Sequence, residues 1–375
     1  MSTGPLSGVR VVELAGIGPT PHAAMLLADW GADVVRVVRP TPSGGPADPD
    51  NDSQLRNRTL VPADLKDPES IPPLLGLIDH ADVLIEGFRP GVTERLGLGP
   101  EPCRRRNPAL IYARMTGWGQ SGPWARTAGH DLNYLAVSGV LSTIGPAGEP
   151  AIPLNLLGDY GGGSMFLVAG ILAGLYERDS SGTGQVVDAA ILDGLSQLAH
   201  PIWSFRQMGM WTEQRNTNIL DGGTPWYSIY RCADDRHVAV AALENKFYSE
   251  LLDGLGLTPA DVPDRAEKQS WPALRSILTQ RFASRTRDEW AARFADTDAC
   301  VTPVLTMSEA LEHPQIVQRG VFDCVDGSTQ PVPAPRFERS TPAAPQPPGT
   351  RITDLTTQLA TWSQQSDRPR NRRSS

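Results

Sequence analysis

Short apolar runs and segments of helical periodicity alternate over residues 9–115. Val9–Leu14 is an apolar run with one acid, a helical pattern covers His22–Trp30, and Asp33–Val38 is apolar again. This order of strand, helix and strand is typical of one unit of a parallel sheet. The alternation continues through Thr59–Leu65, Pro68–Ile78, Ala81–Phe88, Pro100–Arg106 and Leu110–Met115. The pattern predicts an α/β fold built on a doubly wound, open parallel sheet of the Rossmann-like type.

The middle of the chain extends this fold and then leaves it. Gly161–Arg178 has the pattern of a buried helix, Gln185–Ile191 that of another strand, and Leu192–Met208 that of another helix. From Met210 to Thr224 the composition is polar and the stretch ends in Asp221-Gly222-Gly223. Such a stretch is typical of a linker.

The last third of the chain predicts a smaller α+β domain. Trp226–Cys232 and His237–Leu243 flank a short polar turn, which indicates a hairpin. The remaining patterns are three helices and a final apolar run, at Phe247–Leu255, Trp271–Phe282, Arg287–Phe294 and Cys300–Leu305.

The C-terminal part is expected to return to the large domain. Pro331–Pro348 holds seven prolines, which excludes a helix or a central strand and favours an extended path. Ile352–Trp362 has a helical pattern, and Asp367–Ser375 is polar and rich in arginine. We expect this tail to be disordered.

A chain of 375 residues is too long for one ordinary core, so its length also favours two domains. The predicted organisation is a large α/β domain, a linker, a small α+β domain, a return segment and a disordered tail, at residues 1–209, 210–224, 225–330, 331–365 and 366–375.

Composition excludes several classes of protein. The net charge of -8 argues against general nucleic-acid binding. The four cysteines form no CxxC pair, so neither a disulfide framework nor a metal site such as a zinc site is indicated. The longest apolar run, Met165–Tyr176, is interrupted by glycines and too short for a bilayer, and the N-terminus lacks a signal-peptide pattern. We expect a cytoplasmic protein with no membrane partner.

Gly16–Pro21 occupies the place of a dinucleotide fingerprint between the first strand and the first helix. The match is poor because Pro21 replaces the third glycine, and the two prolines remove N–H donors that would bind a pyrophosphate. No acid ends the second strand, although Arg39 keeps a weak NADP alternative open.

Cations gather near the predicted strand ends, at Arg36, Arg39, Arg56, Arg58, Lys66, Arg89 and Arg95. Loops that follow the carboxyl ends of parallel strands share one edge of the sheet, so several of these cations are expected to converge there. Each arginine alone is explained as a solvated surface charge. Together, in an acidic protein, they favour a phosphate-rich ligand.

Two ionisable residues stand among glycines between Ala128 and Ser164. His130 follows Gly129, and Asp131 is a candidate cap for a helix beginning at Leu132. Asp159 precedes Gly161-Gly162-Gly163, and each glycine in a helix costs about 1 kcal/mol relative to alanine. The three glycines favour exposed backbone N–H groups placed against a developing negative charge. His130 and Asp159 together favour proton-transfer chemistry. Glu244 follows the apolar run His237–Leu243. An acid at the start of a helix is explained by the helix dipole as well as by a functional role, so both explanations stay open for Glu244.

These features together resemble the family III CoA-transferase superfamily and, within it, the branch of alpha-methylacyl-CoA racemases. The resemblance runs from about Pro5 to about Phe337. Besides the stretches around His130 and Asp159, it is carried by Leu6–Leu14, Gly31–Val35, Ala63–Lys66, Glu86–Val92 and Thr116–Gln120.

The resemblance implies a catalytic pair. Transferase members of the superfamily use an aspartate at the position of Asp159 to form acyl intermediates, and often carry an aromatic residue where this chain has His130. The sequence Ala128-Gly129-His130-Asp131 is similar to the racemase branch. There the histidine and the aspartate act on opposite faces of the α carbon, and a glutamate matching Glu244 orients the histidine. The implied reaction is an enolate-mediated 1,1-proton transfer without a cofactor, with Gly161 as the candidate enolate-stabilising amide.

For the CoA part of the substrate, the family pattern implies contacts at Arg39, Ala63, Asp64, Leu65, Lys66, Gly87, Phe88, Arg89, Arg95, Gly129, Asp131, Leu132, Asn133 and Tyr134. It also implies an interlocked homodimer in which Glu244 of the small domain reaches the site of the partner chain. A CoA-transferase that uses Asp159 as a nucleophile, and a non-catalytic CoA or NADP binding protein, are the competing readings.

Overall fold

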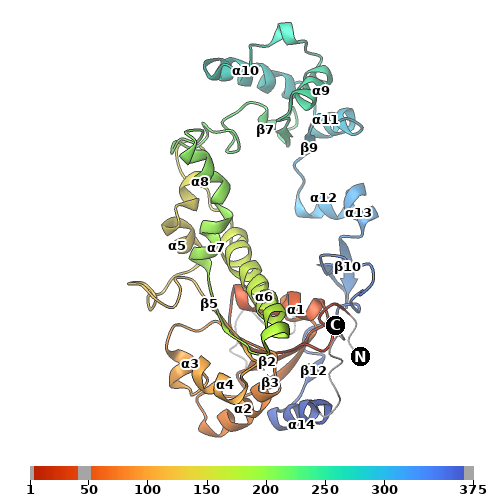
Figure 1. Cartoon of the computed structure of the whole chain (residues 1–375). Helices are drawn as coiled ribbons and strands as arrows, with labels where there is room; N and C mark the ends of the chain where they lie inside the picture. Colours follow the sequence, from red (N-terminus) through yellow and green to blue (C-terminus); the bar gives the residue numbers. More distant parts are fainter. Residues whose placement is uncertain (1–3, 41–51, 367–375) are drawn as a thin grey trace. The chain divides into compact units, whose positions relative to one another are not determined.

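The computed structural model of the chain describes residues 4–40 and 52–366. The chain forms two compact units (Figure 1). Unit 1 holds the described residues up to Ser138, Leu154–Leu198, and those from Gly320 onward, and unit 2 holds Gly139–Pro153 and Ala199–Arg319.

A seven-stranded parallel sheet forms the centre of unit 1, in the order β12-β3-β2-β1-β4-β5-β6. The strands are β1 (Arg10–Leu14), β2 (Asp33–Val38), β3 (Arg58–Pro62), β4 (Val83–Glu86), β5 (Ile111–Thr116), β6 (Val186–Ala190) and β12 (Arg351–Ile352). The predicted parallel sheet is confirmed. Six of its strands lie close to their predicted positions, whereas β12 at the edge was not predicted, because two residues are too short to show a pattern.

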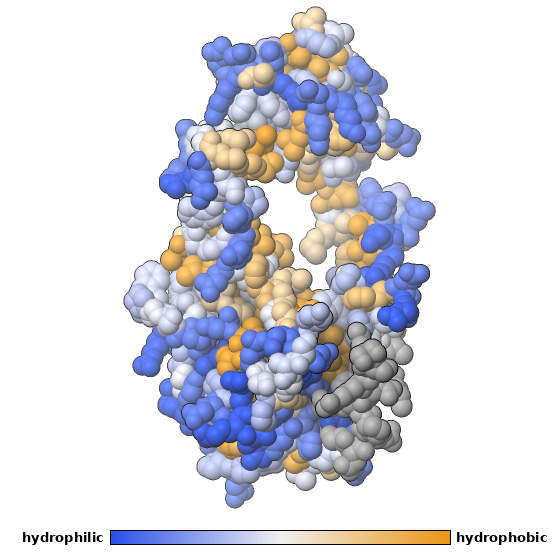
Figure 2. All heavy atoms as spheres, in the orientation of Figure 1, coloured by the Kyte–Doolittle hydropathy of each residue, from blue (hydrophilic) through white to orange (hydrophobic). Residues whose placement is uncertain are grey.

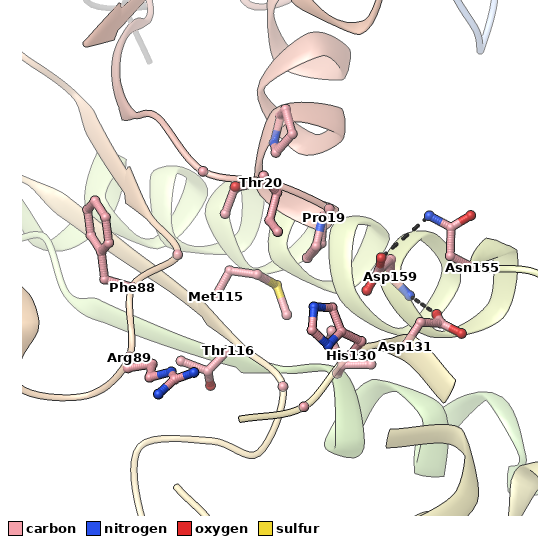
Figure 3. A pocket seen from close by; sticks show the side chains of 18 of the residues that line it. Pro19, Thr20, Phe88, Arg89, Met115, Thr116, His130, Asp131, Asn155 and Asp159 are labelled. Carbon is pink, nitrogen blue, oxygen red and sulfur yellow. Dashed lines mark hydrogen bonds between the residues drawn. The ribbon is translucent and has the colours of Figure 1, made fainter. Parts of the chain in front are cut away.

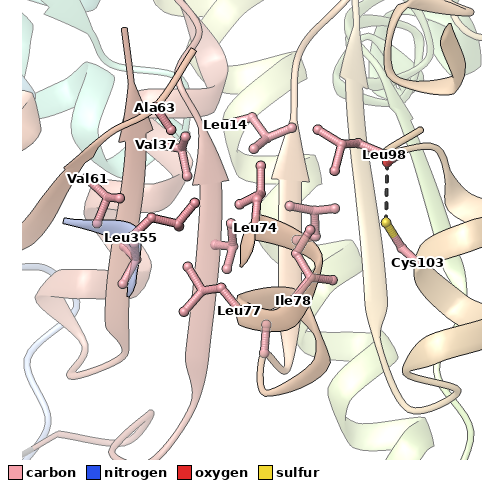
Figure 4. Close-up of a cluster of buried hydrophobic side chains, with 14 of the residues drawn as sticks. Leu14, Val37, Val61, Ala63, Leu74, Leu77, Ile78, Leu98, Cys103 and Leu355 are labelled. Atoms are coloured by element: carbon pink, nitrogen blue, oxygen red, sulfur yellow. Dashed lines mark hydrogen bonds between the residues drawn. The ribbon is translucent and has the colours of Figure 1, made fainter. Parts of the chain in front are cut away.

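Helices cover both faces of this sheet (Figure 1). The helices of the first part of the chain are α1 (Pro19–Asp29), α2 (Ile71–Asp79), α3 (Val92–Arg95) and α4 (Pro100–Arg106). On one face, Leu74 and Leu77 of α2 pack against Leu14 and neighbouring strand residues (Figure 4). Trp362 of the last helix, α14 (Leu355–Ser366), joins the same core. The predicted final helix is confirmed, but it begins three residues later because Ile352 pairs with β3.

The opposite face is covered by a continuous helical segment that differs from the prediction. A π-helix runs over Leu156–Ser164, and α6 (Met165–Ser181) follows without a break. The glycines of α6 allow close packing on the sheet, because a Cβ at Gly174 would lie 3.1 Å from the Ile111 side chain. By length and composition Leu156–Ser181 could cross a membrane. Its residues Leu167, Val168 and Ile171 are buried inside unit 1.

The helix predicted over Leu192–Met208 is two helices, α7 (Ile191–Leu198) and α8 (His200–Gln207). Pro201 lies in the first turn of α8, where its missing N–H costs nothing. A continuous helix would require that N–H, so the chain begins a new helix instead.

Unit 2 confirms the hairpin and the three helices predicted for it. Its strands are β7 (Tyr227–Arg231), β8 (His237–Ala241) and β9 (Val301–Pro303), all paired antiparallel. Its predicted helices are α9 (Asn245–Leu255), α10 (Trp271–Phe282) and α11 (Arg287–Phe294). Trp226, Tyr230 and Phe282 belong to the core that joins the strands to the helices. The short helices α12 (Met307–Glu312) and α13 (Pro314–Arg319) were not predicted.

The boundaries predicted for the domains differ from those observed. Residues 139–153 belong to unit 2, where Arg215 donates hydrogen bonds of 3.0 Å to the carbonyls of Ser142 and Pro146. Residues 199–209 and the predicted linker also belong to unit 2, and Asn218 hydrogen-bonds within that segment to Thr212 and Asp221.

The hairpin of β10 (Phe322–Val325) and β11 (Ser328–Pro331) belongs to unit 1 rather than to the small domain. Arg56 explains this, because its guanidinium donates to Gln330 Oε1 at 3.2 Å and to the Pro331 carbonyl at 2.9 Å. Most of the predicted disordered tail, 367–375, lies outside the described residues.

Candidate active site

A cavity of about 700 Å³ opens at the carboxyl edge of the sheet in unit 1. Loops that follow β1, β4 and β5 line it, together with the start of α5 (Asp131–Val137) and the π-helix. Figure 3 shows His130, Asp131 and Asp159 grouped at one end, and Phe88 and Arg89 at the other. The topology produces this arrangement because the ends of parallel strands share one edge.

His130 is the residue immediately before α5 and has an extended backbone. Its N–H donates a 3.0 Å hydrogen bond to Asn133 Oδ1, and its exposed imidazole lines the cavity. Gly129 is required here, since a Cβ would lie 2.7 Å from the Tyr134 ring. The prediction that Asp131 caps this helix is wrong: α5 begins at Asp131, and the Asp131 carboxylate contacts another segment.

Asp159 lies inside the π-helix rather than at a helix N-cap, and its side chain is half-buried. The carboxylate accepts a 3.4 Å hydrogen bond from Asn155 Nδ2. Burial raises the pKa of Asp159; the Asn155 hydrogen bond lowers it, the negative charge of Asp131 raises it, and His130 lowers it. A raised pKa lets the carboxyl hold a proton more readily, as a proton donor requires.

Gly161, Gly162 and Gly163 allow close packing of the π-helix against its neighbours. The sequence pattern had instead favoured glycines that expose backbone N–H groups. A Cβ at Gly162 would lie 2.9 Å from the Leu195 backbone nitrogen, and one at Gly163 would lie 3.0 Å from Pro19 Cβ. Gly161 packs against Leu198 and is not among the described residues that line the cavity. The structure therefore offers no support for its amide as the enolate donor.

Six of the residues expected to contact CoA line this cavity: Gly87, Phe88, Arg89, Gly129, Asp131 and Tyr134. Eight others are absent from the lining that the structure describes: Arg39, Ala63, Asp64, Leu65, Lys66, Arg95, Leu132 and Asn133. Arg39 and Ala63–Lys66 follow β2 and β3 and so lie at the same edge of the sheet, but Ala63 itself is buried in the core. Asn133 is used to cap α5.

Three of the seven predicted cations stabilise the fold instead of converging on the cavity as free charges. Arg56 forms a buried ion pair of 2.6 Å with Asp29. Arg36 and Arg58 share the fully buried Glu13. Burial lowers the pKa of Arg58 to about 10, although Glu13 opposes this shift. Of the three, only Arg36 also lines the cavity.

This buried triad holds a loop that forms one wall of the cavity. Arg36 donates a 3.1 Å hydrogen bond to the Gly16 carbonyl, and Arg58 donates to the Pro21 carbonyl. A Cβ at Gly18 would lie 3.2 Å from Asp159 Oδ2, so the loop packs directly on the Asp159 carboxylate. The sequence of Gly16–Pro21 indicates only a poor dinucleotide motif. Its position after the first strand was the signal that placed it at this edge.

Other cavity residues that sequence reasoning missed include Met115, Asn155 and Tyr160. None has a distinctive residue type or spacing, so no sequence signal pointed to them. Among residues 4–40 and 52–366, no group of three or more His, Cys, Asp or Glu side chains could hold a metal ion.

Glu244 belongs to unit 2 and precedes α9. Its side chain is exposed and makes no capping hydrogen bond to α9, but its place at the N-cap, where the helix dipole favours an acid, agrees with the helix-start explanation. Arg265 fixes the turn that carries it, donating to the carbonyls of Ala242 and Leu243 at 3.2 and 3.1 Å. The Arg265 guanidinium also stacks over the Trp226 and Tyr248 rings.

Comparison with known proteins identifies the family. The family model described as CoA-transferase family III matches residues 6–351. The chain belongs to CoA-transferase family III. This family III chain is 47% identical over 343 residues to a protein of Mus musculus named alpha-methylacyl-CoA racemase, covering 91% of this chain and 88% of that one. The protein of the same name from Homo sapiens is 46% identical over the same shares.

Solved structures show the same fold for this family III chain. A CAIB/BAIF family protein from Brucella suis superposes with a TM-score of 0.81 at 25% sequence identity, covering 96% of this chain and 99% of that one. The family resemblance expected from the sequence is confirmed.

Proposed function

We propose that this chain is an alpha-methylacyl-CoA racemase that epimerises 2-methylacyl-CoA thioesters by 1,1-proton transfer. The observation that carries the proposal is the grouping of His130 and Asp159 at one end of a cavity whose other end holds Arg89 and Phe88 (Figure 3). The 46–47% identity to proteins named for this activity supports it.

The reaction follows from the chemistry of the two side chains. One of them removes the α proton as a base, the electron pair passes into the thioester carbonyl as an enolate, and the other donates a proton to the opposite face. Proton gain and loss balance, and no electron is transferred. The proposed mechanism therefore requires no cofactor, and CoA is part of the substrate.

Deuterium exchange tests this function. Incubating one enantiomer of a 2-methylacyl-CoA with the protein in heavy water should introduce deuterium at the α carbon and lower the enantiomeric excess, with no acceptor acid added. Mass spectrometry and chiral chromatography measure the two changes. A CoA-transferase that uses Asp159 as nucleophile would instead move CoA to an added carboxylate, and a binding protein would do neither. Complete absence of exchange would sink the racemase proposal.

We also propose that two copies of the chain form a homodimer. Large apolar side chains are exposed on each unit, including Met165 (47% exposed) and Trp203 (45%). Figure 2 shows orange side chains over the face of unit 1 where Figure 1 draws α6 and α7. Such patches mark surfaces that another protein covers, and the family pattern favours a second copy of this chain as that protein.

In this homodimer, Glu244 of one chain orients His130 of the other. Coexpressing His130→Ala and Glu244→Gln chains with different tags tests the arrangement. The mixed dimer should regain about half of the wild-type activity, because one of its sites has both residues intact. If Glu244 acted within its own chain, both sites would stay defective. Activity of the purified mixed dimer no higher than that of either parent would therefore contradict the proposal.

A further inference from the structure

Asp131 connects the segments that carry the two proposed proton-transfer residues. It follows His130 directly as the first residue of α5. Its Oδ1 accepts a 2.7 Å hydrogen bond from the backbone N–H of Asp159, 28 positions away in the sequence (Figure 3). The first N–H groups of a helical segment have no partner within it. The Asp131 carboxylate supplies one for the π-helix.

Gly158 shows that the local structure is built around this carboxylate. A Cβ at Gly158 would lie 2.1 Å from Asp131 Oδ1 and 2.7 Å from its Cγ. The backbone of Gly158 does not adopt a left-handed conformation. Its lack of a side chain is therefore explained by the approach of Asp131, which no larger residue would permit.

We infer that Asp131 is a positioning residue for proton transfer, whose carboxylate holds the backbone of Asp159 in register with His130. This inference rests on the proposed racemase function. Two groups that act on opposite faces of one carbon must both keep hydrogen-bond reach of it, and a misplacement of 1 Å costs about 10²-fold in rate. A bond from the residue beside one group to the backbone of the other sets that separation.

The charge of Asp131 has a second effect. The titratable groups of the described chain that face the Asp159 carboxylate are His130, just before α5, and Asp131 and Tyr134 of α5. The loop before α1 presents the uncharged Gly18. Of these groups, Asp131 raises the pKa of Asp159, which favours the protonated form. Removing this charge should move the pH limb governed by Asp159 to lower pH.

Three variants separate position from charge. Asp131→Asn keeps an oxygen acceptor but removes the charge, Asp131→Ala removes both, and Gly158→Ala keeps the charge but displaces the carboxylate. We expect Asp131→Ala and Gly158→Ala to lower kcat for α-proton exchange by about 10²-fold, with KM for acyl-CoA changed less than about threefold. For Asp131→Asn we expect a loss of about tenfold and a shifted pH limb. Asp354→Asn, which alters an exposed aspartate bonded to Thr357 N–H in α14, is the matched control.

The outcomes distinguish this inference from the function itself. If wild type exchanges deuterium but folded Gly158→Ala and Asp131→Asn keep wild-type kcat and pH profiles, the positioning role is wrong and the racemase function stands. If wild type shows no exchange, the function fails first. Circular dichroism and thermal melting establish folding. Should Asp131→Ala not fold, the Asp131→Asn profile decides: a shifted limb supports the inference, and an unshifted one overturns it.

Discussion

Replacing His130 or Asp159 with alanine should lower epimerisation by about 10³-fold, within the 10²–10⁴ range of a lost general acid or base. The two variants should differ in what they retain. With one group gone, the other still removes and returns a proton on its own face, so each variant exchanges deuterium into one enantiomer without inverting it. Exchange measured separately on the two enantiomers should show opposite preferences for the two variants.

This pattern depends on both residues being at the cavity, where the structure places them. His237→Ala changes an exposed histidine in β8 and serves as the control. Binding of acyl-CoA, measured by calorimetry, should persist in both variants because Arg89 and Phe88 are untouched. Wild-type epimerisation by either alanine variant would refute the assignment of that residue.

Replacing Gly194 with alanine should both destabilise the protein and remove most of its activity. A Cβ at Gly194 would lie 1.8 Å from the carbonyl oxygen of Gly162. Gly194 lies in α7 and Gly162 in the π-helix, so these two helices must separate. Overpacking of this kind costs about 1–3 kcal/mol of unfolding free energy. The π-helix carries Asp159, so displacing it should also lower kcat by about 10²-fold or more.

Thermal melting and the deuterium-exchange rate measure the two effects. Gly148→Ala is the matched control, since a Cβ there would meet no atom within 4 Å. We expect the control to melt and exchange like wild type. A Gly194→Ala protein with wild-type melting and exchange would show that the contact of α7 with the π-helix does not position Asp159.

Whether a prediction from the sequence is confirmed depends on how far apart in the chain the interacting residues lie. Six strands of the sheet show in the sequence, because each of them is a local apolar run such as Val9–Leu14. Domain boundaries do not, because they depend on contacts such as the hydrogen bonds from Arg56 to the β11 strand, 274 and 275 positions away. The prolines of Pro331–Pro348 correctly excluded a helix there, whereas the break at Pro201 was missed.

The cations illustrate the same limit at the candidate site. Arg36, Arg58 and Arg89 look alike in the sequence, since each lies at or near a predicted strand end. In the folded chain Arg36 and Arg58 share the buried Glu13, and Arg89 faces the cavity. Whether an arginine binds a ligand or a buried acid depends on neighbours contributed by other strands.

By itself the sequence determined most of the parallel sheet and the family, and it led to the proposal of His130 and Asp159, because apolar periodicity and distinctive residues in glycine-rich stretches are local properties. Only the tertiary structure decided what surrounds that pair. The Asp131 carboxylate reaches Asp159 across 28 positions, and Gly162 and Gly194 meet from different helices. Such contacts exist only after packing, since hydrogen bonds and close approaches depend on distance in space and not on separation along the chain.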